Sequence, residues 1–156
     1  MVQQGWLLHN LNLFQPINNN ELKSRFTMVM VCFLLLSGCQ LENNERIESF
    51  IVENLSSQSE IDFSEIDWFE WDKLIIVSPY TDLKTLSKGI GVDFGNIENH
   101  AIQNVDFYNL LVFVNKEKSV EICESKNLFS PQNKLLHKEE LSFSRQRDGT
   151  LLLTTK

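Results

Sequence analysis

Residues 74–77 read Leu-Ile-Ile-Val, a short apolar run that stands between Lys73 and the pair Ser78-Pro79. Aliphatic and β-branched residues in a run of this length are typical of a strand that is buried on both faces. Ser-Pro directly after the run favours the end of the strand. The sequence therefore predicts a buried strand at residues 74–77.

A helix is predicted on each side of this strand along the chain. The earlier helix has apolar residues at a helical spacing, and Asn43 or Asn44 can cap it. The later helix can be capped by Thr81 and can end at Gly89 or Gly91. The apolar faces consist of Ile47, Phe50, Ile51 and Leu55 in the first helix and Leu83, Leu86 and Ile90 in the second.

Four further strands are predicted as two hairpins. In the first, Leu110–Val114 and Ser119–Glu124 flank a four-residue loop, which pairs Phe113 with Val120 and Leu111 with Ile122. In the second, Leu141–Gln146 and Thr150–Thr155 flank Arg147-Asp148-Gly149. A three-residue loop there pairs Gln146 with Thr150 and Phe143 with Leu153, and it requires a left-handed Gly149.

These elements predict an α+β fold in two layers, a mostly antiparallel five-stranded sheet with both helices on one face. Residues 61–70 are expected to be irregular or to form a single turn. Residues 92–105 are expected to be a polar loop that Phe94 and Ile97 pin to the core. We expect residues 46–156 to form a single domain of this class.

Composition and charge exclude several classes of function. The chain has 156 residues and a formal charge of −7, so it lacks the basic face that nucleic-acid binding needs. Its six glycines include no loop that could cradle a phosphate, and we expect no cofactor. Three cysteines are too few for a disulfide scaffold.

The amino-terminal region is predicted to be a signal peptide. Residues 26–36 are apolar and follow Lys23 and Arg25, which is the order of a basic region and a hydrophobic region in secretory signals. The run is shorter than the about 20 apolar residues of a membrane-spanning helix. We expect residues 1–38 to be the signal and translation to begin near Leu22, so that residues 1–21 are not made in the cell.

The run ends in Leu36-Ser37-Gly38-Cys39, which resembles the lipobox of bacterial lipoproteins. The resemblance implies cleavage before Cys39, a diacylglyceryl group on its sulfur and residues 39–45 as a lipidated tether. The alternative is an ordinary signal peptide, or a short anchor, with a chance cysteine. The lipid would place the protein in the cell envelope, and Gln40 favours the periplasmic side of the outer membrane if the organism has two membranes.

Residues 68–81, Trp-Phe-Glu-Trp-Asp-Lys-Leu-Ile-Ile-Val-Ser-Pro-Tyr-Thr, resemble a pattern in small uncharacterised bacterial lipoproteins. The resemblance supports a strand followed by a helix, and it implies no chemistry.

Catalytic and metal-binding groups are sparse in the mature chain. His100 and His137 stand alone, so we expect no metal site, which needs three or four ligands at close spacing. Cys123 is expected to be a half-buried structural residue, because Glu121 and Glu124 would disfavour a thiolate. A carboxylate pair could come from one acidic region, which contains Glu60, Asp62, Glu65, Asp67, Glu70 and Asp72.

Aromatic residues interleave with these carboxylates and suggest an interaction surface. We take Phe63, Trp68, Phe69 and Asp72 as its candidate residues, and we expect Trp71 to belong to the core. The sequence thus favours a membrane-anchored, non-enzymatic module that binds an unknown envelope protein. One alternative is an envelope hydrolase that uses a carboxylate pair in Glu60–Asp72, and another is an acidic inhibitor or immunity-type protein.

Overall fold

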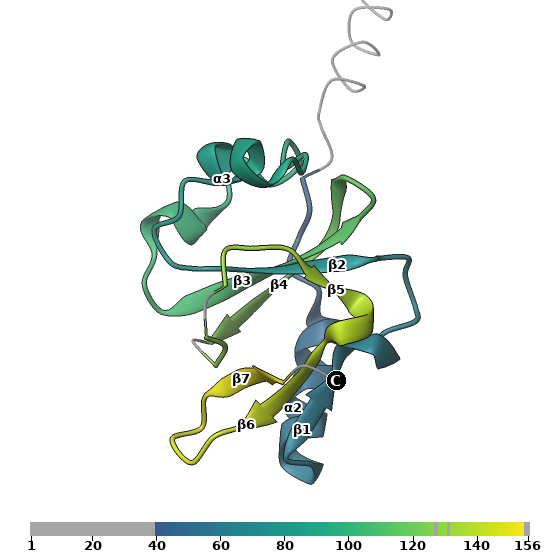
Figure 1. Cartoon of the computed structure of the whole chain (residues 1–156). Helices are drawn as coiled ribbons and strands as arrows, with labels where there is room; N and C mark the ends of the chain where they lie inside the picture. Colours follow the sequence, from purple (N-terminus) through teal and green to yellow (C-terminus); the bar gives the residue numbers. More distant parts are fainter. Residues whose placement is uncertain (1–39, 127, 131, 155–156) are drawn as a thin grey trace, which may run out of the picture. The chain divides into compact units, whose positions relative to one another are not determined.

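The computed structural model describes residues 40–154 except 127 and 131, and the predicted signal and Cys39 lie outside these residues. The described residues form two α-helices and seven β-strands in two antiparallel sheets, so the predicted α+β class is confirmed (Figure 1). The helices are α2 (Glu45–Ser57) and α3 (Leu83–Ile90). The strands are β1 (Glu60–Asp62), β2 (Lys73–Val77), β3 (Tyr108–Asn115), β4 (Lys118–Lys126), β5 (Leu136–His137), β6 (Ser142–Arg145) and β7 (Leu151–Thr154).

The larger sheet has the strand order β4-β3-β2-β5, with β2 inside it. Leu74, Ile75, Ile76 and Val77 are all fully buried, as expected of a strand covered on both faces. Lys73 of β2 pairs with Val114 of β3 on one side and with His137 of β5 on the other. The apolar run is therefore an internal strand of the larger sheet.

The prediction of one five-stranded sheet is wrong, because the carboxy-terminal hairpin leaves the larger sheet. Strand β6 pairs with β1 and β7 to form a second sheet of order β1-β6-β7. The free edge of β2 is occupied instead by β5, a two-residue strand that the sequence did not predict. Within the hairpin the predicted register is confirmed: Phe143 faces Leu153, and Gly149 has a φ of 88°.

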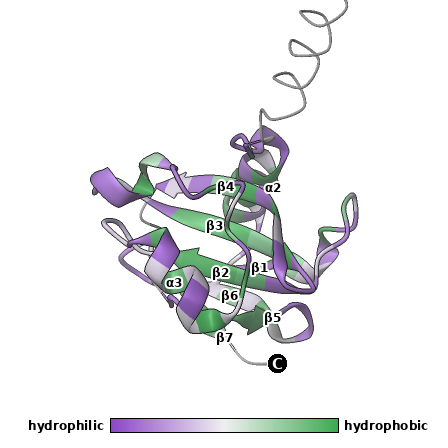
Figure 2. Cartoon of the chain, turned by 90° about the horizontal axis from the view of Figure 1, so that it is seen from above, coloured by the Kyte–Doolittle hydropathy of each residue, from purple (hydrophilic) through white to green (hydrophobic). Residues whose placement is uncertain are grey.

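The helices cover opposite faces of the larger sheet, so the prediction of both on one face is also wrong. Ile47 of α2 belongs to a first core, which includes Leu74 and Ile76. Leu83 of α3 belongs to a second core, which includes Ile75 and Val77. Figure 2 colours long stretches of β2 and β3 as hydrophobic. Because both faces of these strands are apolar, each needs a cover, and one helix serves each face.

The first hairpin contains a β-bulge that changes its predicted pairing. Val114 pairs with Ser119, but the register then shifts, and Phe113 faces Glu121 instead of the predicted Val120. Leu111 faces Cys123 instead of Ile122. The bulge directs Ile122 into the second core and Cys123 into the first, whereas the predicted register would have put Glu121 opposite buried Val112.

Polar side chains define where the helices begin. The Asn44 side chain accepts hydrogen bonds from the backbone N–H groups of Arg46 and Ile47, so it is the N-cap of α2. Asp82 caps α3, which makes Thr81 the residue before the cap, and Gly91 ends the helix at a φ of 71°. None of the helices in the described residues is long and apolar enough to cross a membrane.

Short segments complete the two cores. Residues 63–65 form a single 3-10 turn, as expected for this region, and β1 before it is an additional short strand. Phe94 and Ile97 are buried, so the loop that contains them is pinned as predicted. Residues 101–104 form a second 3-10 turn on the same side of the sheet as α3.

Candidate functional site

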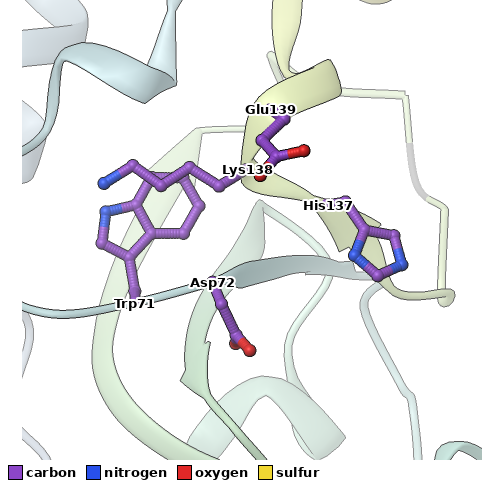
Figure 3. Close-up of a pocket in the computed structure, with 5 residues that line it drawn as sticks. All are labelled: Trp71, Asp72, His137, Lys138 and Glu139. Atoms are coloured by element: carbon purple, nitrogen blue, oxygen red, sulfur yellow. The ribbon is translucent and has the colours of Figure 1, made fainter.

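The segment between the first 3-10 turn and β2 is held in place by one backbone carbonyl. The oxygen of Ile66 accepts hydrogen bonds from Trp71 Nε1 at 3.0 Å and from Lys138 Nζ at 2.9 Å. The Lys138 ammonium lies 4.5 Å from the centre of the Trp71 ring and covers it, as Figure 3 shows. Residues 66–72 therefore have a defined conformation, and Trp71 belongs to the core as predicted.

Asp72 ties this segment to the turn between β3 and β4. Its Oδ1 accepts a hydrogen bond from the backbone N–H of Lys116 at 3.1 Å, and its Oδ2 pairs with Lys73 Nζ at 3.0 Å. Its backbone N–H donates to the oxygen of Val114, and its carbonyl accepts from the N–H of Lys138. Asp72 therefore holds the start of β2 to the β3–β4 turn and to Lys138.

A hollow of about 490 Å³ lies beside this segment and is lined by Trp71, Asp72, His137, Lys138 and Glu139 (Figure 3). His137 and Glu139 are exposed and come from β5 and the turn after it. Figure 3 shows the Asp72 carboxylate pointing away from Glu139. The lining offers hydrogen-bond donors and acceptors to a polar group. No local pattern in the sequence indicated that His137, Lys138 and Glu139 would lie beside Trp71 and Asp72 in this hollow.

The predicted interaction surface divides into core and surface residues. Phe63 is fully buried and packs against Phe129 and Phe143, with ring centres 5.8 and 5.4 Å apart, so it cannot touch a partner directly. Trp68 and Phe69 are half-buried neighbours whose ring centres lie 6.3 Å apart. They remain available for contact.

Arg46 adds a positive charge to these aromatics, which the sequence did not suggest. Its guanidinium carbon lies 4.3 Å from the centre of the Trp68 ring. The indole N–H of Trp68 is buried and has no hydrogen-bond partner among the described residues. We call Arg46, Trp68 and Phe69 the aromatic surface.

The acidic region does not supply two carboxylates to the hollow. Asp62 Oδ1 accepts a hydrogen bond from the backbone N–H of Ser64 and so caps the first 3-10 turn. Five of the six predicted carboxylates are on exposed residues: Glu60, Glu65, Asp67, Glu70 and Asp72. In the part of the chain that the structure describes, the hollow takes in Asp72 and none of the other five.

His100 lies in a polar contact away from the hollow. Its Nδ1 accepts a hydrogen bond from the backbone N–H of Ile102 at 3.2 Å, and its Nε2 lies 3.3 Å from Glu124 Oε1. Burial lowers the pKa of His100, and the charge of Glu124 opposes that shift. The neutral imidazole with its proton on Nε2 fits both contacts.

Cys123 is fully buried in the first core, more deeply than the half-buried position expected. Burial raises the pKa of its thiol to about 12, and the charges of Glu48 and Glu124 act in the same direction. A protonated thiol in this position does not act as a nucleophile at neutral pH.

The described residues, 40–154 except 127 and 131, contain no group of three His, Cys, Asp or Glu side chains that could hold a metal ion.

Comparisons of the chain with protein families, curated proteins and solved structures find no match.

Proposed function

We propose that the protein is a lipid-anchored envelope protein whose α+β domain is a non-enzymatic module for binding another envelope protein. The anchor rests on one observation, the lipobox-like sequence Leu36-Ser37-Gly38-Cys39 behind a basic and a hydrophobic region. A diacylglyceryl group supplies two buried acyl chains, and two chains are enough for stable anchoring without a membrane-spanning helix.

Binding is assigned to the aromatic surface because its chemistry suits a protein contact. Tryptophan and arginine are enriched at interface positions that dominate affinity, and Trp68 and Arg46 stack on each other. The neighbouring segment is held by the paired hydrogen bonds to Ile66, so little conformational entropy is lost when a partner covers it. A half-buried aromatic that is already oriented can gain further burial from the partner.

The anchor is tested by replacing the lipidated residue. Cys39→Ser should abolish incorporation of labelled palmitate and release the protein from the membrane fraction. A matched Cys123→Ser variant should keep both label and membrane association, because Cys123 is buried in the domain. Equal labelling of the parent and of Cys39→Ser would contradict the lipid anchor.

The binding role is tested by affinity capture from an envelope extract. A Trp68→Ala, Phe69→Ala double variant should lose a partner that the parent protein captures. Val52→Ala is the matched control, because Val52 is an apolar side chain 55% exposed on α2 and outside the aromatic surface. The melting temperatures of both variants are compared first, so that lost capture is not caused by unfolding.

The identity of the captured protein separates the remaining alternatives. The mature chain has 12 Lys and Arg against 20 Asp and Glu, a formal charge of −8. Capture of a basic toxin or hydrolase would favour the inhibitor alternative, because opposite charges speed and orient such encounters. Capture that survives the double variant would contradict the aromatic surface as the binding site.

A further inference from the structure

The residues that follow the predicted lipidation site are built into the domain. The backbone N–H of Leu41 donates to the oxygen of Asn96 at 3.1 Å, and the N–H of Asn44 donates to the oxygen of Ile122 at 2.9 Å. The Leu41 side chain packs against the second core. The tether predicted for residues 39–45 is therefore attached to the domain from Leu41 onward.

Two asparagine side chains strengthen this attachment along the edge strand β4. Asn43 Oδ1 accepts a hydrogen bond from the backbone N–H of Glu124 at 2.8 Å, and Asn43 forms a parallel bridge with Ile122. Asn44 Nδ2 donates to Glu121 Oε2 at 3.0 Å. We call residues 41–44 the latch. Its bonds reach β4 and the loop of Asn96, which lie more than fifty residues away in the sequence.

We propose that the latch fixes the orientation of the domain on the membrane, so that one defined end of the domain faces the lipid headgroups. This inference rests on the proposed anchor at Cys39. Gln40 alone separates Cys39 from the first latched residue, and two residue steps span at most about 7 Å. A chain this short holds the latched end of the domain at the membrane surface, whereas a long flexible tether would let the domain turn freely.

The membrane-facing end consists of the loop 93–96 and the turn between β3 and β4. The backbone N–H of Asp93 donates to the oxygen of Glu117 at 2.7 Å, and Asn96 Nδ2 donates to the oxygen of Ser119 at 2.8 Å. Figure 1 shows the first described residues at the same end of the domain as the β3–β4 turn, and the β6–β7 turn at the opposite end.

The charges of this end nearly balance. Lys116 and Lys118 of the turn offset Glu117 and the neighbouring Asp93, and the latch adds exposed Glu42. The mature chain as a whole carries a formal charge of −8, which anionic headgroups would repel. The proposed orientation therefore rests on the latch and not on charge, because the β6–β7 turn at the opposite end has Arg145 and Arg147 against Asp148 alone.

The test uses the lipidated protein in phosphatidylcholine vesicles in which some headgroups carry a nitroxide quencher. A fluorophore is attached at Glu117→Cys, beside the latch, or at Arg147→Cys, in the β6–β7 turn; both residues are exposed. Buried Cys123 is not labelled in the folded protein. We expect several-fold stronger quenching at position 117 than at position 147. Inserting about eight Gly and Ser residues between Gln40 and Leu41 should remove most of that difference, because the longer linker frees the domain.

Equal quenching at the two positions without the insertion would overturn the fixed orientation. Flotation of the same vesicles tests the anchor separately: the Cys39→Ser protein should stay in solution, and if it floats, the anchor fails and the orientation with it. Amide hydrogen exchange tests the latch without any lipid. The amides of Asn44 and Glu124 should be protected, and exchange at the rate of unstructured chain would overturn the latch.

Discussion

Gly149 and Gly89 both have space for a side chain, but only Gly149 has a left-handed backbone conformation. A Cβ added at either would meet no atom within 4 Å, yet Gly149 has a φ of 88° in the β6–β7 turn and Gly89 lies within α3. Strain is therefore confined to Gly149, because a left-handed backbone conformation crowds any Cβ.

We expect the two alanine substitutions to have opposite signs. Gly149→Ala should lower the free energy of unfolding by about 1–2 kcal/mol. Gly89→Ala should raise it by about 0.4–1 kcal/mol, because alanine restricts the unfolded chain and fits the helix. Urea denaturation measures both. A stabilising Gly149→Ala would contradict the left-handed turn and the register of the last hairpin.

His100 should make stability depend on pH. Its pKa is lowered by burial, with Glu124 opposing, so below the ordinary value of 6.5 the unfolded chain binds more protons than the folded one. Stability should therefore fall as the pH drops from about 7.5 through the His100 pKa. Protonation of Nδ1 would also remove the acceptor for the Ile102 N–H.

His100→Asn separates this effect from the rest of the titration. An asparagine oxygen can still accept from the Ile102 N–H, but the side chain does not titrate. We expect the melting temperature of this variant to fall less than that of the parent between about pH 7.5 and 5.5. Identical losses in both proteins would show that His100 does not couple to folding.

Helix α3 begins at a cap formed by Asp82. Asp82 accepts hydrogen bonds from the backbone N–H groups of Lys84 and Thr85 and from the Thr85 hydroxyl. The Thr85 hydroxyl bond, followed by the backbone bond from Thr85, lowers the pKa of Asp82. A lowered carboxyl pKa means that the cap stabilises the fold above the ordinary value of 3.8 and that this contribution is lost as the pH falls through the folded value.

We expect Asp82→Ala to lower the melting temperature at pH 7, because the first turn of α3 loses its acceptor. The difference from the parent should shrink when both proteins are measured at acid pH near or below the ordinary carboxyl pKa. Thr81→Ala is the matched control and should have a smaller effect, because Thr81 precedes the cap. Equal effects of the two variants would contradict Asp82 as the N-cap.

Phe63 packs between the two sheets. Its ring contacts Phe113 of β3 at a centre-to-centre distance of 6.2 Å and Phe143 of β6 at 5.4 Å, and it also contacts Phe50 of α2. The side chain is fully buried. The smaller sheet is thus held to the larger one through aromatic packing around a single residue of the connecting turn.

Phe63→Ala should reduce the free energy of unfolding by about 3–5 kcal/mol, the cost of a large cavity in a core. Phe107→Ala is the matched control: Phe107 is 64% exposed, and its loss should cost less than about 0.5 kcal/mol. Denaturation monitored by tryptophan fluorescence measures both. Similar costs for the two variants would contradict the central position of Phe63.

Local patterns in the sequence were sufficient to predict the helices, strands and turns whose formation depends on residues close together in the chain. The run Leu74–Val77 predicts the buried strand. Asn43 or Asn44 predicts the start of α2, and Gly89 or Gly91 predicts the end of α3; the structure uses Asn44 and Gly91. Glycine at position 149, together with alternating apolar residues, also predicts the register of the last hairpin. Within the candidate site, the sequence pointed to Trp68 and Phe69 as candidate surface aromatics, and both are half-buried.

Four features depend on contacts between segments far apart in the chain and were not predicted from local sequence: the second sheet, the placement of the helices on opposite faces, the hollow and the latch. Strands β1 and β5 have only three and two residues, too few for a periodic pattern, and each exists because a distant partner completes its hydrogen bonds. Lys138 reaches Trp71, and Asn43 reaches Glu124, through pairings between segments far apart in the sequence. Such contacts form because apolar faces must be covered and edge groups paired, and a residue's neighbours along the chain do not specify which distant segment does so.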